Sequence, residues 1–168
     1  MRKLFLFFLF LFLSFELNAK TKPPFSNISV LIEPKDYGKI TFEDFEGKEI
    51  NLKEYKSEIY ILNFWASWCA PCKKEMPSLD RLYSNENIKI FAINVEVKNK
   101  NKTRKFFEDL NIKNLNIYFD TDLKLSKLLS LRGLPTTIIL NKDRKVIAKI
   151  IGDVDFDDPS FLSWLFDV

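Results

Sequence analysis

The sequence predicts a single α/β domain with a central mixed sheet flanked by helices, and three observations support this class. Residues 59–65 form a continuous apolar run of strand length, which is typical of a strand buried on both faces. Predicted strands and helices alternate through the middle of the chain, which indicates parallel central strands. Residues 136–140 and 146–151 flank a short polar turn, which predicts a closing antiparallel hairpin.

The N-terminus has the charge and hydropathy pattern of an export signal. Arg2 and Lys3 precede ten consecutive apolar residues, and Ala19 is a small residue at the expected cleavage point. We therefore expect residues 1–19 to be a cleaved signal peptide. An uncleaved N-terminal membrane anchor is the alternative, because Leu17 is larger than the residue preferred three positions before a cut. Both alternatives place the chain in the periplasm or another exported location, where a cysteine pair persists as a disulfide.

Two segments follow the signal. Residues 20–38 contain three prolines and no periodicity, so we expect an extended N-terminal arm. Residues 39–168 form the predicted domain. It begins with a β-hairpin whose strands are residues 40–45 and 49–52, joined by a turn that contains Gly47.

The rest of the domain alternates helices and strands. A helix is predicted over residues 70–85, with Pro71 tolerated in its first turn and Pro77 expected to kink it. The other predicted elements are strands over residues 88–97 and 115–119 and helices over residues 103–110, 122–131 and 160–166. No internal repeat or linker divides the chain.

Composition and charge exclude several function classes. The chain has 26 basic and 23 acidic residues, a net charge of +3, and the two signs are interleaved, so we expect no nucleic-acid partner. It has no histidine, which excludes histidine-based nucleophile activation and histidine metal ligands. It has only two cysteines, Cys69 and Cys72, and they are three positions apart.

The position of this cysteine pair favours redox chemistry. Cys69 lies where a buried strand ends and a helix begins, and unsatisfied N–H groups at a helix N-terminus favour a thiolate. We expect Cys69 to be an exposed nucleophile and Cys72, one turn later, to be more enclosed. A structural zinc site would need carboxylates to complete four ligands, and a structural disulfide closing so small a loop would constrain the unfolded chain little.

Two motifs resemble the TlpA/ResA-like thioredoxin proteins, a family of exported thiol–disulfide oxidoreductases. Residues 63–77, NFWASWCAPCKKEMP, look like the family's active-site segment, and residues 133–139, GLPTTII, match the segment that carries its cis-proline. The resemblance implies a thioredoxin fold with an N-terminal β-hairpin extension. It also implies a redox disulfide between Cys69 and Cys72, with Cys69 as the attacking thiolate and Cys72 as the resolving thiol.

The resemblance further implies how a partner binds. Pro135 is the expected cis-proline, and the backbone of Leu134 is expected to pair with an extended substrate peptide. Trp68 and Thr136 complete the expected substrate-binding set.

Glu75 matches the family's active-site acid. A partly buried carboxyl at this position would have a raised pKa and could exchange a proton with the resolving thiol. A solvated helix charge beside Lys73 and Lys74 is the alternative. Asn63 occupies the position where cytosolic thioredoxins carry a buried acid, and its amide cannot titrate.

We therefore expect a disulfide reductase that acts on partner protein cysteines, with no cofactor and no metal. The family suggests apocytochrome c and the copper-assembly proteins of cytochrome oxidase as substrates, a membrane reductant donor protein as electron source, and a monomer. One alternative is a disulfide-introducing oxidase, although residues 98–114 are too few for the helical insertion of the DsbA type. The other is a copper-handling assembly factor that holds Cu(I) through the cysteine pair. A peroxiredoxin is disfavoured, because no proline lies at residues 62–68.

Overall fold

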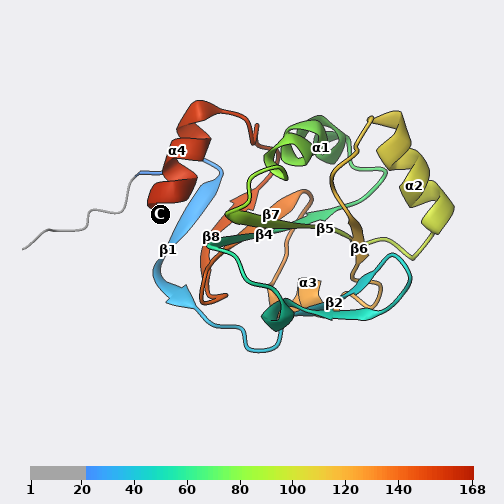
Figure 1. The fold of residues 1–168 in the computed structure, drawn as a ribbon, viewed down its shortest axis with the longest axis horizontal. Coiled ribbons are helices and arrows are strands. Elements are labelled where there is room, and N and C mark those ends of the chain that lie inside the picture. Colours follow the sequence, from blue (N-terminus) through green and yellow to red (C-terminus); the bar gives the residue numbers. More distant parts are fainter. Residues whose placement is uncertain (1–21) are drawn as a thin grey trace, which may run out of the picture.

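The computed structural model describes residues 22–168, which form one mixed eight-stranded sheet with helices on both faces (Figure 1). The expected signal peptide and the first residues of the expected arm lie outside the described residues. Within residues 22–168, no helix has the length and apolar character that a membrane span requires. The predicted α/β class with a mixed sheet is confirmed.

The sheet has its parallel strands in the middle and antiparallel pairs toward both edges. Its strands, in spatial order, are β1 (Ile28–Lys35), β8 (Val146–Ile151), β7 (Thr136–Asn141), β4 (Ile59–Trp65), β5 (Ile88–Asn94), β6 (Ile117–Phe119), β2 (Thr41–Asp44) and β3 (Glu49–Asn51). The β4–β5 and β5–β6 pairs are parallel, whereas every other pair is antiparallel. The predicted hairpin β2–β3 therefore extends the far edge of the sheet.

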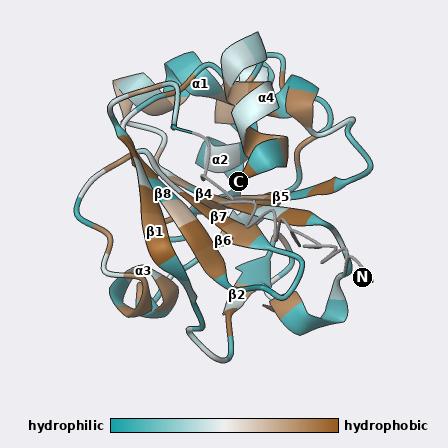
Figure 2. Cartoon of the chain, turned by 90° about the vertical axis from the view of Figure 1, so that its left-hand side faces the viewer, coloured by the Kyte–Doolittle hydropathy of each residue, from teal (hydrophilic) through white to brown (hydrophobic). Residues whose placement is uncertain are grey.

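Helices cover the two faces unequally. The helices are α1 (Ala70–Leu82), α2 (Lys100–Asp109), α3 (Lys124–Leu128) and α4 (Pro159–Asp167), with a 3-10 turn, η1, at Leu52–Glu54. Helices α1, α2 and α4 lie on one face and α3 lies on the other (Figure 2). The longer helices thus shelter the face on which the cysteine pair is found.

Strand β4 divides the hydrophobic core in two. Its residues alternate, so that Ile61 and Trp65 join the cluster beneath α1, α2 and α4, whereas Leu62 and Phe64 join the opposite cluster. All seven residues of β4 are buried, as the continuous apolar run predicted. By the same alternation, Asn63 projects toward the α1 side.

The structure adds a strand in the segment predicted as an extended arm. Residues 28–35 form β1, which pairs with β8 through registers such as Ile28↔Ile150. Its pairing is irregular between Val30 and Lys35, and it carries Pro34 at the edge of the sheet. An irregular edge strand with a proline lacks the alternation that sequence analysis detects.

Helix α3 is shorter than the prediction of residues 122–131. Leu123 and Ser130 adopt positive φ angles of 55° and 54°, the left-handed region that a helix cannot include. These two residues bracket the helical segment, which therefore ends within two turns.

Candidate active site

The turn between β4 and α1 places Cys69 at the N-terminus of α1. Cys69 is the N-cap residue, and its Sγ accepts a hydrogen bond from the Cys72 N–H at 3.3 Å. The Cys69 N–H itself donates to the Ala66 carbonyl at 3.1 Å, which closes a tight turn. Pro71 lies in the first turn of α1, where its missing N–H costs nothing. In the reduced state, the unpaired N–H groups of this helix end would stabilise a thiolate on Cys69.

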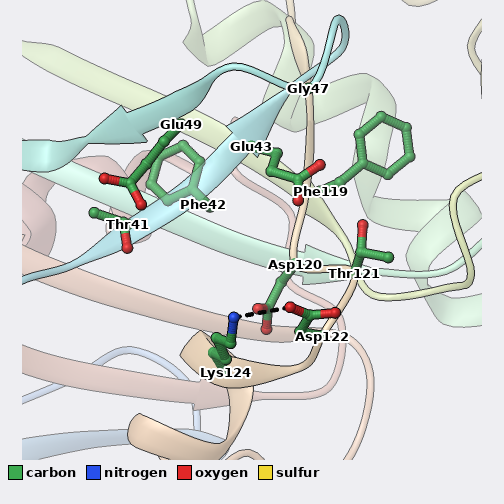
Figure 3. A pocket seen from close by; sticks show the side chains of 10 residues that line it. All are labelled: Thr41, Phe42, Glu43, Gly47, Glu49, Phe119, Asp120, Thr121, Asp122 and Lys124. Atoms are coloured by element: carbon green, nitrogen blue, oxygen red, sulfur yellow. Dashed lines mark ion pairs between the residues drawn. The ribbon is translucent and has the colours of Figure 1, made fainter.

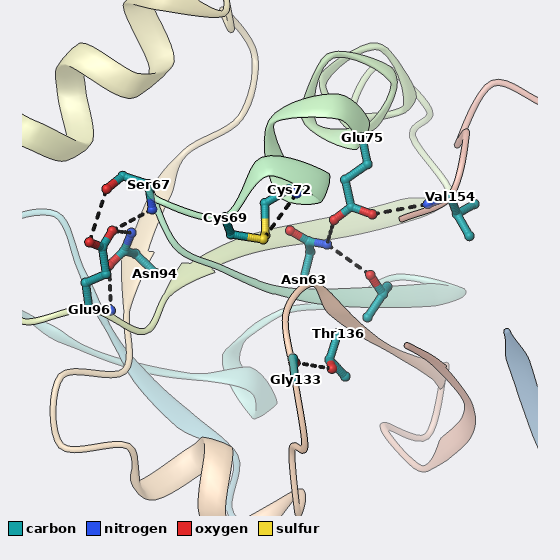
Figure 4. The surroundings of a disulfide bond; sticks show 11 residues. Asn63, Ser67, Cys69, Cys72, Glu75, Asn94, Glu96, Gly133, Thr136 and Val154 are labelled. Atoms are coloured by element: carbon teal, nitrogen blue, oxygen red, sulfur yellow. Dashed lines mark hydrogen bonds between the residues drawn. A yellow bond between two sulfur atoms is a disulfide. The ribbon is translucent and has the colours of Figure 1, made fainter. Parts of the chain in front are cut away.

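Cys69 and Cys72 form a disulfide, with their Cα atoms 5.3 Å apart (Figure 4). Cys72 is fully buried, as expected for the resolving thiol. The expectation that Cys69 is exposed is wrong, because the residue keeps only 4% of its surface. Its sulfur turns inward as the helix cap and as half of the disulfide. The exposed side chains at this turn belong to its neighbours, above all Trp68, which is 68% exposed.

The segment before β7 approaches the cysteine turn from the neighbouring strand. Thr136 pairs with Phe64, so Pro135 lies beside the last residues of β4, which lead directly to Cys69. The Leu134–Pro135 peptide bond is cis, as the resemblance implies. Thr136 is 1% exposed, and its Oγ1 donates to the Gly133 carbonyl at 2.7 Å, so its side chain shapes this segment from within.

Glu75 lies near the disulfide in a buried hydrogen-bond network (Figure 4). It is 2% exposed, and its Oε1 accepts a 2.7 Å hydrogen bond from Asn63 Nδ2. The same Asn63 Nδ2 also donates to Thr137 Oγ1 at 2.9 Å, and the Val154 N–H donates to Glu75 Oε2 at 3.3 Å. No cation pairs with Glu75 among the described residues.

Burial determines the protonation of Glu75. Desolvation raises its pKa from an ordinary value near 4.5 to about 8, although the hydrogen bonds from Asn63 and Val154 lower it in part. The alternative of a solvated helix charge does not fit this environment, since the side chain points away from Lys73 and Lys74 into the core. A carboxyl that titrates near neutral pH can both accept and donate a proton.

The structure also shows a site residue that sequence analysis missed. Glu96, just beyond β5, accepts hydrogen bonds from the Ser67 N–H at 2.6 Å and the Ser67 hydroxyl at 3.1 Å. Asn94 Nδ2 and Lys102 Nζ donate to the same carboxylate at 3.3 Å and 2.6 Å. Burial opposes the ionisation of Glu96, but these donors outweigh it and lower its pKa. Through its hydrogen bonds to Ser67, Glu96 therefore stabilises the turn that carries Trp68 and Cys69.

A pocket away from the disulfide, at the β2–β3 hairpin, is rich in acidic side chains (Figure 3). Its carboxylates already have partners. Glu43 pairs with Lys98 at 2.9 Å, and Asp122 pairs with Lys124 at 2.8 Å. Asp120 accepts the N–H groups of the first residues of α3. These carboxylates are occupied by local contacts, and none of them belongs to the cysteine site.

The comparisons identify the family. The model described as the AhpC/TSA family matches residues 35–149. The chain belongs to this family. Over 131 residues it is 31% identical to the thiol–disulfide oxidoreductase ResA of Bacillus subtilis, a match that covers 76% of this chain and 72% of that protein. Its relatives therefore include thiol–disulfide oxidoreductases of the ResA type.

Two further similarities agree with this placement. ResA of Bacillus cereus is 35% identical over 113 residues, which is 66% of this chain and 64% of the relative's length. The structure of a secreted thiol–disulfide isomerase from Corynebacterium glutamicum superposes with a TM-score of 0.68 at 21% identity, covering 87% of this chain and 96% of that one. At this identity the structural match supports the thioredoxin-like fold alone.

Proposed function

We propose that the chain is an exported disulfide reductase that acts on cysteines of partner proteins. The observation that carries this proposal is the Cys69–Cys72 disulfide at the start of α1, with a buried carboxyl of pKa about 8 one turn further along the helix. An attacking sulfur at a helix N-terminus, a sheltered second sulfur and a proton carrier are the parts that thiol–disulfide exchange needs.

The reaction begins from the reduced pair. The Cys69 thiolate attacks one sulfur of the partner disulfide, breaks that bond and releases one partner sulfur, which takes up a proton. The Cys72 thiol then loses its proton and attacks Cys69 Sγ. This step releases the second partner sulfur as a thiol and restores the Cys69–Cys72 disulfide. Two electrons pass from the protein to the partner. Cys72 gives up one proton, and solvent supplies the second, which the Cys69 thiolate does not carry.

Glu75 is the group best placed to take the proton from Cys72. It follows Cys72 by three positions on α1, so both side chains lie on the same helix face. In its ionised form the Glu75 carboxylate accepts the thiol proton, and the buried carboxyl then holds it in its neutral form. Asn63 cannot compete for this proton, which leaves the task to Glu75.

Two features favour reduction over oxidation. Pro71 stands between the cysteines where oxidising relatives of the DsbA type often carry histidine, a cation that makes the disulfide more oxidising. Between β5 and β6 the chain forms only α2 and short loops, with no inserted helical domain. Copper binding has less support, because the two sulfurs would need a third ligand and the chain has no histidine.

The location and the partners belong to the same proposal. The signal expected at residues 1–19 supports an exported protein, cleaved or anchored. The electron source that we propose is a membrane reductant donor protein. The substrates we propose are cysteines of apocytochrome c or of copper-assembly proteins of cytochrome oxidase.

Equilibration with glutathione buffers tests the direction of the reaction. A reduction potential of about −270 mV or lower, as in thioredoxin, supports a reductase. A potential near about −120 mV, as in DsbA, would make the protein an oxidase. Identifying proteins trapped on Cys72→Ser as mixed disulfides names the partner, with Cys69→Ser/Cys72→Ser as the control that traps nothing.

A further inference from the structure

A cleft of about 350 Å³ opens between the cysteine turn and α2. Ser67 and Lys73 form its edge on the cysteine side, and residues of α2 and its C-terminal end form the rest. Its position relative to the sulfur follows from the chain, because Ser67 precedes Cys69 by two residues and the Lys73 N–H donates to the Cys69 carbonyl at 3.2 Å. The cleft therefore borders the turn to which a partner segment would be bonded through Cys69.

The floor of the cleft is apolar. Phe106 lines it, is 5% exposed, and stacks on Trp65 with ring centroids 4.4 Å apart. Trp65 is the last residue of β4, so the floor is anchored in the central strand that leads to the active site. Leu110 adds a second, half-buried apolar side chain. This floor offers an apolar contact to a side chain of a partner.

The rim of the cleft is basic. Lys73, Lys102 and Lys105 line it together with one acidic residue, Asp109. Lys102 already pairs with Glu96 at 2.6 Å, so Lys73 and Lys105 are the cations that a partner could engage. Within residues 22–168, no ion pair involves Lys73. The Lys105–Asp109 pair is 72% and 59% exposed, and an exposed pair of this kind contributes little. A carboxylate of a partner could therefore pair with Lys73, which has no ion pair among the described residues, or with Lys105, whose pair with Asp109 is weak.

We infer that this cleft binds the segment of a partner protein next to its reactive cysteine, and that it selects segments carrying an acidic and an apolar side chain. The inference rests on the proposed reductase function and adds a substrate preference to it. The apolar floor supplies contact area, and the lysines supply the charge preference and the electrostatic attraction of the encounter.

Two synthetic peptides test the inference. Both carry one leucine and one cysteine as a 2-pyridyl disulfide, and they differ only in aspartate or lysine beside the cysteine. The Cys69 thiolate attacks the peptide sulfur and breaks its bond to the pyridyl sulfur. The pyridyl group leaves as a thiolate, which takes up a proton from solvent and becomes 2-thiopyridone. Cys72 then resolves the mixed disulfide, and the peptide leaves as a thiol. The readout is the ratio of the two second-order rate constants in single turnover, acidic over basic peptide.

We expect the wild-type protein to prefer the acidic peptide by about three- to fivefold at low salt, and the preference to shrink at high salt. The Lys73→Glu/Lys105→Glu variant should bring the ratio below one. The matched control is Lys127→Glu/Lys142→Glu, which changes the net charge equally but lies on α3 and in the β7–β8 turn. It should keep the wild-type ratio.

The contradicting results are distinct. A wild-type ratio of one at low salt overturns the inference, and so does a control variant that changes the ratio as much as the cleft variant does. Either result leaves the reductase proposal intact. Failure of the reduced protein to react with both peptides and with 2,2′-dipyridyl disulfide would instead contradict the reductase proposal.

Discussion

Glu75 and Glu96 are two glutamates near the same disulfide, and their surroundings are opposite in electrostatic character (Figure 4). Glu75 is buried and receives one side-chain donor and one long backbone hydrogen bond, so its pKa rises to about 8. Glu96 receives Lys102 and donors from Ser67 and Asn94, so its pKa falls. The comparison shows that burial alone does not neutralise a carboxylate. Glu75 is the more deeply buried of the two and Glu96 has more donors, and these two differences together set the opposite directions of the pKa shifts.

The largest expected effect is on the stability of Glu75→Gln. Because the pKa of Glu75 is higher in the folded state than its ordinary value, folding is penalised as the pH rises from about 4.5 to 8 and the penalty levels off above that. The variant removes this penalty, so it should be more stable than wild type by about 2–4 kcal/mol at pH 9 and nearly equal at pH 4.

Urea unfolding of the oxidised protein across this pH range measures the effect. Glu86→Gln, an exposed glutamate shortly after α1, is the matched control and should change stability little at any pH. A gain for Glu75→Gln that is the same at pH 4 and pH 9 would mean that the proton is not involved.

Glu96→Gln should behave in the opposite way. The pKa of Glu96 is lower in the folded state, so its contribution is present above the ordinary value near 4.5 and is lost as the pH falls through the folded value. We expect the variant to lose about 1–2 kcal/mol at neutral pH, and less under acid conditions. A loss that does not depend on pH would assign Glu96 to packing rather than to charge.

The same variant separates a fastening role from a general loss of stability. If Glu96 positions the cysteine turn through Ser67, the alkylation rate of reduced Cys69 should change in Glu96→Gln under conditions where both proteins are fully folded. An unchanged alkylation rate would mean that Glu96 contributes to the stability of the fold and does not position Cys69.

A smaller effect on stability is expected for two lysines of α2 that form ion pairs. Lys102→Met removes the cation bound to the sheltered Glu96, whose side chain is 14% exposed, and should cost about 0.5–1 kcal/mol. Lys105→Met removes the cation of an exposed pair on the same helix and should cost close to nothing. Urea unfolding at low salt measures both losses of stability. Equal losses in the two variants would show that the burial of Glu96 does not strengthen its ion pair.

Much of the fold follows from local patterns in the sequence. The buried run of residues 59–65, the hairpin around Gly47 and the helix that begins at the cysteine pair are all present, because each depends on hydropathy and turn residues close in sequence. Strand β1 depends instead on pairing with β8, which is distant in sequence, and its irregular register leaves no periodic pattern.

The site divides in the same way. The roles proposed for Cys69 and Cys72 rest on their spacing along one helix, which the sequence contains. The burial of Cys69 depends on the rotamer of a helix cap, which spacing does not determine. The Glu96 contacts depend on the parallel pairing of Trp65 with Asn94, which brings the ends of β4 and β5 together. Polar residues directly after two adjacent parallel strands were the available signal for Glu96.

The most direct test of the central claim, that Glu75 titrates near neutral pH beside the redox pair, is a carboxyl titration by NMR. Protein labelled with ¹³C at the glutamate carboxyl carbon, with Glu75→Gln and Glu96→Gln used for assignment, reports both sites in one experiment. The account predicts a midpoint of about 8 for Glu75 and a midpoint below 4.5 for Glu96. A Glu75 midpoint near 4.5 would contradict it, because a carboxylate that is ionised throughout the neutral range could not hold the proton of Cys72.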